Sequence, residues 1–348
     1  MLAAESGTRV TDTDGQVLAA VWRGDRRLDV GHWPLPVMGA DDALVRVRGC
    51  GVCGSDVHIV DGDLTEFVPP RVLGHEPLGV IEAVGSAVRQ FRPGDEVTWE
   101  PSLPCRSCLY CREGEDGLCV QRIPMLGGFA ERTVVPQRAL CSVPAGLPAG
   151  TGVLAEPLSC ALYAHDRGRI RVGDQVAVIG AGTIGLLLTM LAQRAGASLV
   201  VVSDPNPRKR QIAAEVGADV VIDPATTSLP DCIRDLTDGR GVHVAFEAVG
   251  APATVIDTLA ALRPGGTAVL VGLPPVAAAA NVPLFDLLRR DVTIEAVWLR
   301  RFTFQRAVAL LRELPVHRLV SHRVPLEQIA AAFELLRSGE AVKVVVEP

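Results

Sequence analysis

The sequence predicts an α/β protein with two domains, one a β-rich and partly open barrel and the other built on a parallel sheet. Its 348 residues are enough for about two domains at roughly 150 residues each. Between residues 21 and 135, short apolar runs are cut by Gly and Pro, which is typical of an all-β barrel. Between residues 167 and 272, strand-like and helix-like runs alternate, which indicates βαβ units.

The barrel region begins after a polar segment. Residues 1–17 are polar and rich in Gly, Thr and Asp, so we expect a flexible leader there. Residues 1–30 carry many charges and no apolar core, which is unlike a secretory signal, so we expect a cytoplasmic protein. Strands of the barrel are predicted at Ala43–Val47, Val80–Val84 and Glu96–Trp99.

The second region follows the βαβ pattern up to residue 272. The stretch Gln175–Gln193 carries no charge, but its glycines follow a β-branched run, so it fits a buried strand, a turn and a buried helix better than a membrane span. After Thr293 we expect helices near Phe304–Leu311 and Leu326–Leu336 and a last strand at Val342–Val346. The earlier strands are predicted at Val176–Ile179, Leu199–Ser203, Val220–Ile222, Val242–Glu247 and Ala268–Gly272, with helices at Ile184–Ala195 and Pro207–Val216.

The charge balance excludes several partners. Thirty-four Lys and Arg stand against 40 Asp and Glu, which gives a net charge of -6. No basic excess is present to neutralise a polyphosphate, so we expect no nucleic-acid partner. The negative sign also argues against binding to an anionic membrane surface.

A G-x-G-x-x-G motif marks the turn from the first strand of the parallel sheet to its helix, and it predicts a dinucleotide site. Gly180 is expected to make the tight turn, Gly182 to let a pyrophosphate approach the backbone, and Gly185 to let the helix pack closely on the strand. The helix start, with Thr183 and Ile184, offers free N–H groups and a partial positive charge.

An acidic residue further along the chain favours NAD. Asp204 ends the second strand, where this fingerprint places the acid that binds the ribose 2′-hydroxyl. Its charge would repel a 2′-phosphate, whereas Arg208, also a candidate cofactor contact, and Lys209 weaken the preference for NAD over NADP. The alternative is that the glycines serve helix packing alone and that Asp204 is a helix cap.

Four closely spaced cysteines predict a structural zinc site. Their spacing is C-x2-C-x2-C-x7-C, and a tetrahedral zinc bound by four sulfurs has no open position for a substrate. Free thiols or a redox pair are the alternative. The four ligands would be Cys105, Cys108, Cys111 and Cys119.

A second set of possible metal ligands mixes residue types and is scattered along the chain. Cys53 stands close to Asp56 and His58, the pair His75 and Glu76 follows, and Glu156 comes much later. A Cys, a His and a Glu together can make a mixed zinc site that keeps one position open for substrate. Each of these residues alone is more often structural, and the sequence does not show that they meet.

These motifs resemble those of the zinc-dependent medium-chain dehydrogenase/reductases, and within them the polyol (sorbitol-like) and threonine dehydrogenase branch. The resemblance covers nearly the whole chain, and the motifs come in the family's order. They are Cys53–Asp56, Gly74–Gly79, the four-cysteine segment, Gly128–Glu131 and Glu156–Leu158. The fold so implied is a GroES-like β-rich catalytic domain, made of residues 18–165 and 300–348, around a Rossmann doubly wound parallel-sheet domain of residues 166–299.

The resemblance also implies roles for the scattered residues. Cys53 and His75 would ligate a catalytic zinc, with Glu76 or Glu156 as the further protein ligand. Asp56 would orient the zinc histidine. Ser55 and His58 would relay the proton of the alcohol, and Glu76 belongs to the catalytic set as well. Two zinc ions per chain, a nicotinamide cofactor and a homodimer or homotetramer are expected.

The chain also departs from the family. Residues 61–70 and 120–127, which would wall the substrate cleft, are short, and residues 1–16 are extra. By resemblance, an arginine close to substrate or cofactor is expected at Arg300 or Arg301; the alternative is that both are solvated cations at a helix start.

Three functions are compatible with these patterns. The first is a zinc-dependent oxidoreductase that transfers a hydride from a secondary alcohol of a polyol, sugar or cyclitol to NAD, and the glutamate at position 156 favours it. The second is an NADPH-dependent reductase of aldehydes or ketones. The third is a dinucleotide-binding protein that has lost its catalytic metal, which the presence of all four candidate ligands disfavours.

Overall fold

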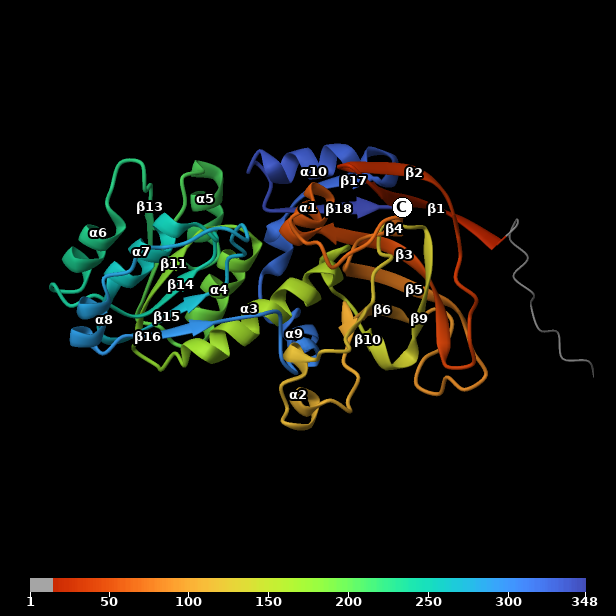
Figure 1. Cartoon of the computed structure of the whole chain (residues 1–348), viewed down its shortest axis with the longest axis horizontal. Helices are drawn as coiled ribbons and strands as arrows, with labels where there is room; N and C mark the ends of the chain where they lie inside the picture. The colour runs from red at the N-terminus through yellow and green to blue at the C-terminus, as the bar shows by residue number, and fades with distance from the viewer. Residues whose placement is uncertain (1–14) are drawn as a thin grey trace, which may run out of the picture.

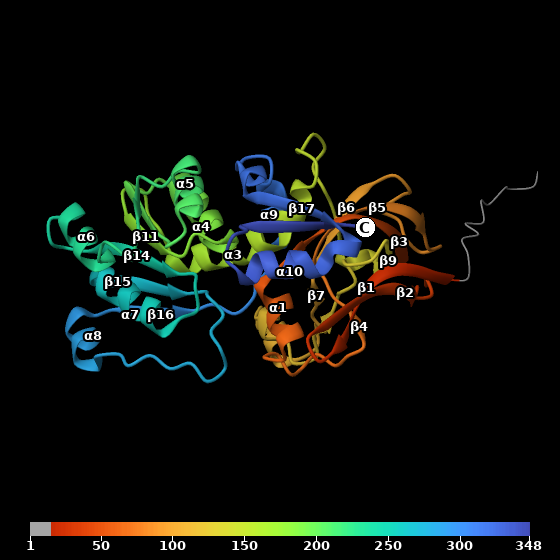
Figure 2. The same ribbon diagram turned by 90° about the horizontal axis from the view of Figure 1, so that it is seen from above.

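The computed structural model describes residues 15–348, and two large sheets dominate it (Figure 1). Seen from above, the parallel sheet lies at one end of the molecule and the mainly antiparallel sheets at the other (Figure 2). The helix α3 (Ala155–Gly168) lies between the two ends and packs on α4 (Thr183–Arg194) and α9 (Phe304–Leu310). It therefore joins the two parts of the core.

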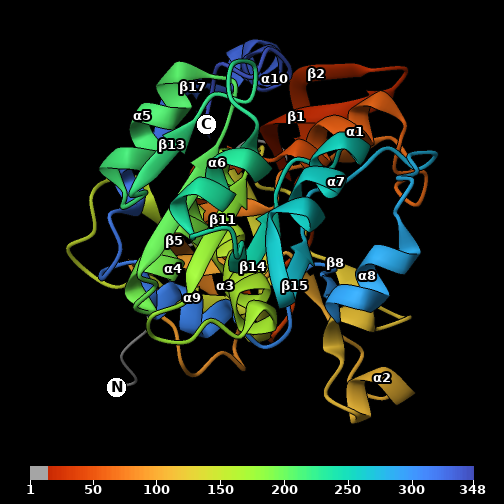
Figure 3. The ribbon, with the colours of Figure 1, turned by 90° about the vertical axis from the view of Figure 1, so that its left-hand side faces the viewer.

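The parallel sheet has six strands in the order β13-β12-β11-β14-β15-β16, and all its pairings are parallel (Figure 3). Alternate residues of its central strand β11 are buried on opposite faces. Val176 and Val178 pack with α3 and α4, whereas Ala177 and Ile179 pack with residues of the helices on the other side. Burial on both faces is what a doubly wound sheet requires.

The bounds in this half agree with the predicted βαβ pattern to within a few residues, apart from an early start of β15. Its strands are β11 (Gln175–Ile179), β12 (Leu199–Ser203), β13 (Val220–Ile222), β14 (Val242–Glu247), β15 (Leu262–Leu270) and β16 (Thr293–Ala296). Its helices, besides α4, are α5 (Pro207–Glu215), α6 (Leu229–Leu236), α7 (Pro252–Ala261) and α8 (Leu284–Arg290). The uncharged stretch 175–193 is β11 followed by α4, and among residues 15–348 no helix is long and apolar enough to cross a membrane.

Strands from both ends of the chain build the second large sheet. Its order is β10-β6-β5-β3-β18-β17, with β9 also paired to β3. The long strand β3 (Asp42–Val52) therefore pairs with β18 (Lys343–Glu347), which is the last strand of the chain. The others are β5 (Glu76–Val84), β6 (Glu96–Trp99), β9 (Arg132–Pro136), β10 (Leu140–Ser142) and β17 (Val320–Pro325). This sheet and its neighbours have the GroES-like arrangement that the motifs implied.

Smaller elements complete this half. A three-stranded sheet has the order β2-β1-β4, and its first strand begins at Gln16. The flexible leader was predicted over residues 1–17, so its last two residues belong to a strand instead. Residues 1–14 of that prediction lie outside the described residues. The elements are β1 (Gln16–Gly24), β2 (Arg27–Pro34), β4 (Arg71–Val72), α1 (Gly54–Asp61), β7 (Ser102–Leu103), α2 (Leu109–Arg112), β8 (Ile123–Pro124) and α10 (Ile329–Arg337). Short 3-10 helices are η2 (Asp116–Leu118), η3 (Gln137–Ala139), η4 (Thr151–Leu154), η5 (Val316–Leu319) and η6 (Leu326–Gln328).

Candidate active site

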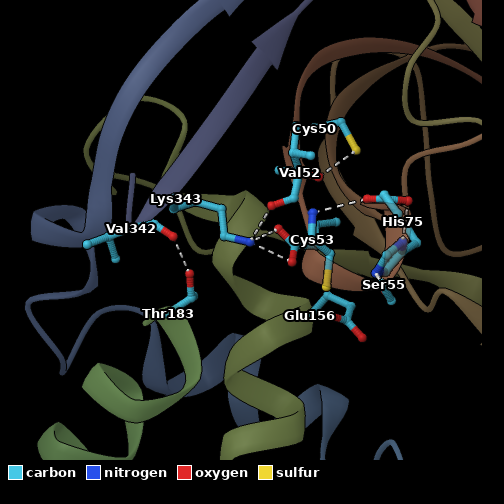
Figure 4. A network of polar contacts seen from close by, with 12 residues as sticks. Cys50, Val52, Cys53, Ser55, His75, Glu156, Thr183, Val342 and Lys343 are labelled. Carbon is cyan, nitrogen blue, oxygen red and sulfur yellow. Dashed lines mark hydrogen bonds and ion pairs between the residues drawn. The ribbon is translucent and has the colours of Figure 1, made fainter. Parts of the chain in front are cut away.

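Two neighbouring strands bring three of the scattered residues together. Cys53 follows β3 and caps α1, whereas His75 and Glu76 stand at the start of β5. Because β3 and β5 pair with Gly51 opposite Glu76, the two motifs meet at one end of the sheet. One ligand atom each from Cys53, His75 and Glu76 lies within 4.8 Å of the other two. Cys53 and His75 are labelled in Figure 4.

A buried aspartate fixes two members of this cluster. Asp56 accepts a hydrogen bond from the backbone N–H of Cys53 at 3.0 Å, and its other oxygen lies 3.2 Å from Nδ1 of His75. Burial disfavours a charged His75 imidazole, but the charge and hydrogen bond of Asp56, together with the interactions of Cys53, outweigh this effect and raise the pKa of His75 well above its ordinary value. With Nδ1 bound, Nε2 is the nitrogen left for a metal, which is how carboxylates orient metal-binding histidines.

Two further residues of the motif flank the cluster. The Ser55 hydroxyl lies 3.4 Å from Nε2 of His75, inside the site. His58, near the end of α1, is half-buried, and its Nδ1 lies 2.8 Å from a carboxylate oxygen of Asp63. Asp63 was not singled out from the sequence, although it follows Gly62, whose positive φ of 89° turns the chain back toward α1.

The two candidate glutamates have different surroundings. Glu76 is fully buried and forms an ion pair with Lys343, a residue for which the sequence offered no role. Glu156, in the first turn of α3, is also buried, and Sγ of Cys160 lies 3.5 Å from its Oε1. Glu156 does not belong to the cluster, because its carboxylate lies more than 4.8 Å from at least one of the ligand atoms of Cys53, His75 and Glu76.

The four remaining predicted ligands form a compact group in the loop that carries α2. The sulfurs of three pairs lie 3.5 to 4.0 Å apart, and all four sulfurs lie within 4.8 Å of one another. A tetrahedral zinc with Zn–S bonds of about 2.3 Å separates its sulfurs by about 3.8 Å. Ser107 donates to the sulfur of Cys105 from both its hydroxyl and its backbone and lowers the pKa of that thiol to about 5. The donor set therefore fits a closed tetrathiolate site at Cys105, Cys108, Cys111 and Cys119.

Two arginines attach the segment after β16 to the four-cysteine lobe, residues 105–119, and to the residues just before it. Arg300 is buried and donates to Glu100 at 3.0 Å and to the Ser102 carbonyl at 3.3 Å. Arg301 forms an ion pair with Glu115. The alternative that both arginines are solvated cations is therefore wrong, because both are paired.

The glycine-rich turn has the geometry expected of a nucleotide loop. Gly180 has a φ of 98°, which only glycine adopts readily. A Cβ on Gly185 would lie 1.8 Å from the Gly180 carbonyl, so this glycine is required for the helix to pack on the strand. A Cβ on Gly182 would have no atom within 4 Å, so space is open beside the backbone at the start of α4.

Asp204 is tied to this turn rather than to a helix. Its two oxygens accept hydrogen bonds from the backbone N–H groups of Ala181 and Asn206, both at 2.8 Å. The cap of α5 is Asn206, which accepts from the backbone of Arg208, so the alternative that Asp204 is a helix cap is wrong. Arg208, in the first turn of α5, is exposed.

Thr183 connects the nucleotide turn to the last strand. Its hydroxyl donates to the carbonyl of Val342 at 2.7 Å, next to Lys343 (Figure 4). Ile184 is partly buried against the core. The start of α4 is thus held directly beside the strand that reaches the Cys53 cluster.

Family models match both the β-rich part and the parallel-sheet part of the chain. Residues 39–145 match the family model described as alcohol dehydrogenase GroES-like domain, and residues 183–313 match the one described as zinc-binding dehydrogenase. The fold and the clustered thiolate, imidazole and carboxylate groups therefore belong to a dehydrogenase of the zinc-binding class.

Relatives that align over nearly the whole chain indicate the branch of the family. The chain is 34% identical to sorbitol dehydrogenase of Rattus norvegicus over 96% of both chains, and 33% identical to L-threonine 3-dehydrogenase of Symbiobacterium thermophilum over 95% of this chain and 99% of that one. A putative zinc-binding dehydrogenase from Sinorhizobium meliloti, solved bound to NADP, superposes with a TM-score of 0.90 at 32% identity, over 96% of this chain and all of the other. The chain belongs to the zinc-dependent medium-chain dehydrogenase/reductase family, in its polyol and threonine dehydrogenase branch.

Proposed function

We propose that the chain oxidises a secondary alcohol of a polyol, sugar or cyclitol with NAD as the acceptor. The observation that carries the proposal is the mixed donor cluster of Cys53, His75 and Glu76 at the end of β3 and β5, with the nucleotide turn tied to the neighbouring strand β18. Glu156 supports the polyol branch, and the similarity to sorbitol dehydrogenases agrees with it.

Two zinc ions per chain are part of this proposal. The tetrathiolate group suits a closed structural zinc, because all four positions are protein sulfurs. The mixed cluster suits a catalytic zinc, because one thiolate, one imidazole and one carboxylate leave a fourth position for substrate. Asp56 supports the second assignment, since it leaves Nε2 of His75 available.

The residues around the cluster have distinct roles in the proposed reaction. When bound, the zinc supplies Lewis-acid polarisation of an alcohol oxygen and the nicotinamide supplies the redox chemistry. Ser55, within hydrogen-bonding reach of His75, accepts the proton of the alcohol at its hydroxyl oxygen and passes its own proton on. His58 receives a proton at the half-exposed end of α1, where the Asp63 carboxylate holds its ring.

Asp204 supports NAD as the cofactor. Its buried carboxylate is held by two backbone N–H groups beside the nucleotide turn, where a 2′-phosphate would meet its negative charge. The second candidate, an NADPH-dependent reductase of aldehydes or ketones, is favoured by the related structure bound to NADP and by the exposed Arg208. The ratio of kcat/KM with NAD to kcat/KM with NADP separates the two.

The substrate class is tested with a panel of alcohols. Polyols, cyclitols, amino alcohols and simple primary alcohols are each assayed with NAD, and kcat/KM is compared. The proposal expects the highest value for a secondary alcohol with a neighbouring hydroxyl group. A best substrate among simple primary alcohols, or turnover only of ketones with NADPH, would contradict it.

A homodimer or homotetramer is also proposed. The strand β16 is an edge of the six-stranded sheet, and exposed edges of this kind pair readily with other strands. Large apolar side chains are exposed on this strand and on the preceding α8, namely Ile294, Leu284, Phe285 and Leu288. Light scattering of the purified chain tests this, and a monomer at micromolar concentration would contradict it.

A further inference from the structure

A carboxylate outside the family motifs holds the ring of His58. Nδ1 of His58 lies 2.8 Å from Oδ2 of Asp63. Among residues 15–348 this is the one hydrogen bond of either side chain, so the two groups are bonded only to each other. Asp63 stands in the segment 61–70, where the chain departs from its family, and the motifs therefore give it no role.

The end of α1 is built so that this contact forms. Gly62 ends the helix with a φ of 89°, a left-handed conformation that glycine adopts without a steric penalty. The backbone N–H of Asp63 then donates to the carbonyl of His58 at 2.9 Å. In a continued helix, residues five positions apart would lie on different faces. The glycine turn therefore brings the Asp63 carboxylate back to the His58 ring.

The contact contributes little to the stability of the fold. The Asp63 side chain is 51% exposed and the His58 side chain is 27% exposed. Ion pairs at such positions are weak, because water screens the charges and ordering the side chains costs entropy. The consequence of the contact lies instead in the state of the His58 ring.

The carboxylate decides which ring nitrogen carries a proton. An ionised carboxylate only accepts hydrogen bonds, so Nδ1 of His58 is the N–H donor in this contact. In a neutral imidazole the other nitrogen, Nε2, is then the acceptor. A ring without such a partner exchanges between two tautomers, and the one protonated at Nε2 has no lone pair there to take up a further proton. Asp63 therefore keeps Nε2 of His58 ready to accept.

We propose that Asp63 is a positioning residue for proton transfer, which holds His58 in the tautomer whose Nε2 accepts the proton released by the alcohol. This inference rests on the proposed function, because it explains how His58 performs the role proposed there. The proton that enters at Nε2 gives an imidazolium with one proton on each nitrogen. The ring then releases a proton to water at the half-exposed end of α1, which restores the neutral form, and the Asp63 carboxylate stays ionised throughout.

Nitrogen-15 NMR of the full-length chain, labelled at its histidines, tests the tautomer without any substrate. The spectrum of His58→Gln identifies the His58 signals by their absence. At a pH where the ring is neutral, we expect the parent His58 to carry its proton on Nδ1 and Asp63→Ala to populate both tautomers. A parent ring protonated on Nε2, or a tautomer ratio that Asp63→Ala does not change, would overturn the inference.

Asp61→Ala is the matched control. This carboxylate stands two positions before Asp63 at the same helix end, but it accepts a hydrogen bond from Arg337 and not from His58. Its removal changes the local charge by the same amount as Asp63→Ala. We expect the tautomer of His58 to stay as in the parent, and a shift as large as that of Asp63→Ala would contradict a specific role of Asp63.

A double-mutant cycle tests whether the tautomer serves the reaction. With NAD and the best alcohol of the panel, Asp63→Ala should lower kcat/KM by about threefold or more near neutral pH, with NADH affinity and zinc content unchanged. Asp61→Ala should stay within about twofold of the parent. In the His58→Ala chain the ring is gone, so adding Asp63→Ala should change kcat/KM by less than about twofold, because residues that act as one unit are not additive.

The outcomes separate the inference from the proposed function. If Asp63→Ala keeps the kcat/KM of the parent, or lowers it equally with and without His58, Asp63 does not act through His58. The inference is then wrong, whereas the activity of the parent chain keeps the proposed function. If the parent chain oxidises no alcohol of the panel with NAD, the proposed function fails, and the role of Asp63 in its proton transfer fails with it.

Discussion

Substitution by alanine is predicted to have different effects at two glycines of the nucleotide turn. At Gly185 it should destabilise the fold, whereas at Gly182 it should weaken cofactor binding. In Gly185→Ala the new Cβ would lie 1.8 Å from the Gly180 carbonyl. Real Cβ contacts are essentially never below 3.0 Å, so the helix and the turn must move apart at this point. The atom in the way is a backbone carbonyl between β11 and α4, which cannot rotate aside. We expect a loss of about 3 kcal/mol or more, at the upper end of the range for overpacking.

Gly182→Ala is the matched control. Its φ of -74° suits alanine, and no atom lies within 4 Å of the new Cβ. Losing glycine as a helix cap costs a fraction of a kcal/mol to about 1 kcal/mol, which the less flexible unfolded chain partly offsets. Stability should therefore stay within about 1 kcal/mol of the parent. The Cβ occupies the space expected for the pyrophosphate, so we expect NADH to bind at least about tenfold more weakly, or about 1.4 kcal/mol.

Urea unfolding and NADH fluorescence titration measure the two effects separately. Gly185→Ala should unfold at lower urea with and without cofactor. Gly182→Ala should stay within about 1 kcal/mol of the parent without cofactor and should gain less stability than the parent when NADH is added. A Gly182→Ala chain that binds NADH as tightly as the parent would refute the placement of the cofactor. A Gly185→Ala chain of unchanged stability would refute the packing argument.

Three other predictions concern the metal sites and the cofactor. Cys108→Ser should remove one zinc per chain and lower the melting temperature by about 5 °C or more, because the lobe has little core of its own, and an unchanged zinc content would contradict the structural site. His58→Ala should slow turnover by about tenfold or more near neutral pH with zinc retained; loss of zinc would instead make His58 a ligand. Asp204→Ala should lower the NAD to NADP ratio of kcat/KM by about tenfold, and the same ratio in both chains would exclude the ribose contact.

Local patterns account for what the sequence predicted well. The β-branched runs and the three glycines specify β11, the turn and α4 through contacts between residues close in the chain. The four lobe cysteines are close neighbours in the sequence, so their spacing alone predicts that they meet. Cys53 and His75 meet because β3 and β5 are neighbours, which motif order indicates only through resemblance to a family.

Long-range contacts account for what was missed. Lys343 is 267 positions from Glu76, and no periodicity links them. One available signal was composition, because Lys343 and Lys209 are the only lysines among the 34 Lys and Arg residues of the sequence. The pairing of Arg300 with Glu100 spans 200 positions and depends on how the segment after β16 packs on the residues that precede the four-cysteine lobe. Such contacts are set by tertiary packing, which no local pattern encodes.

The central claim is that Cys53 and His75 hold a metal with an open position beside the nucleotide turn. A crystal structure with anomalous data at the zinc edge tests this most directly. We expect two peaks per chain, one among the four lobe cysteines and one in contact with Sγ of Cys53 and Nε2 of His75. A single peak, confined to the lobe of a fully zinc-loaded and active protein, would contradict the account.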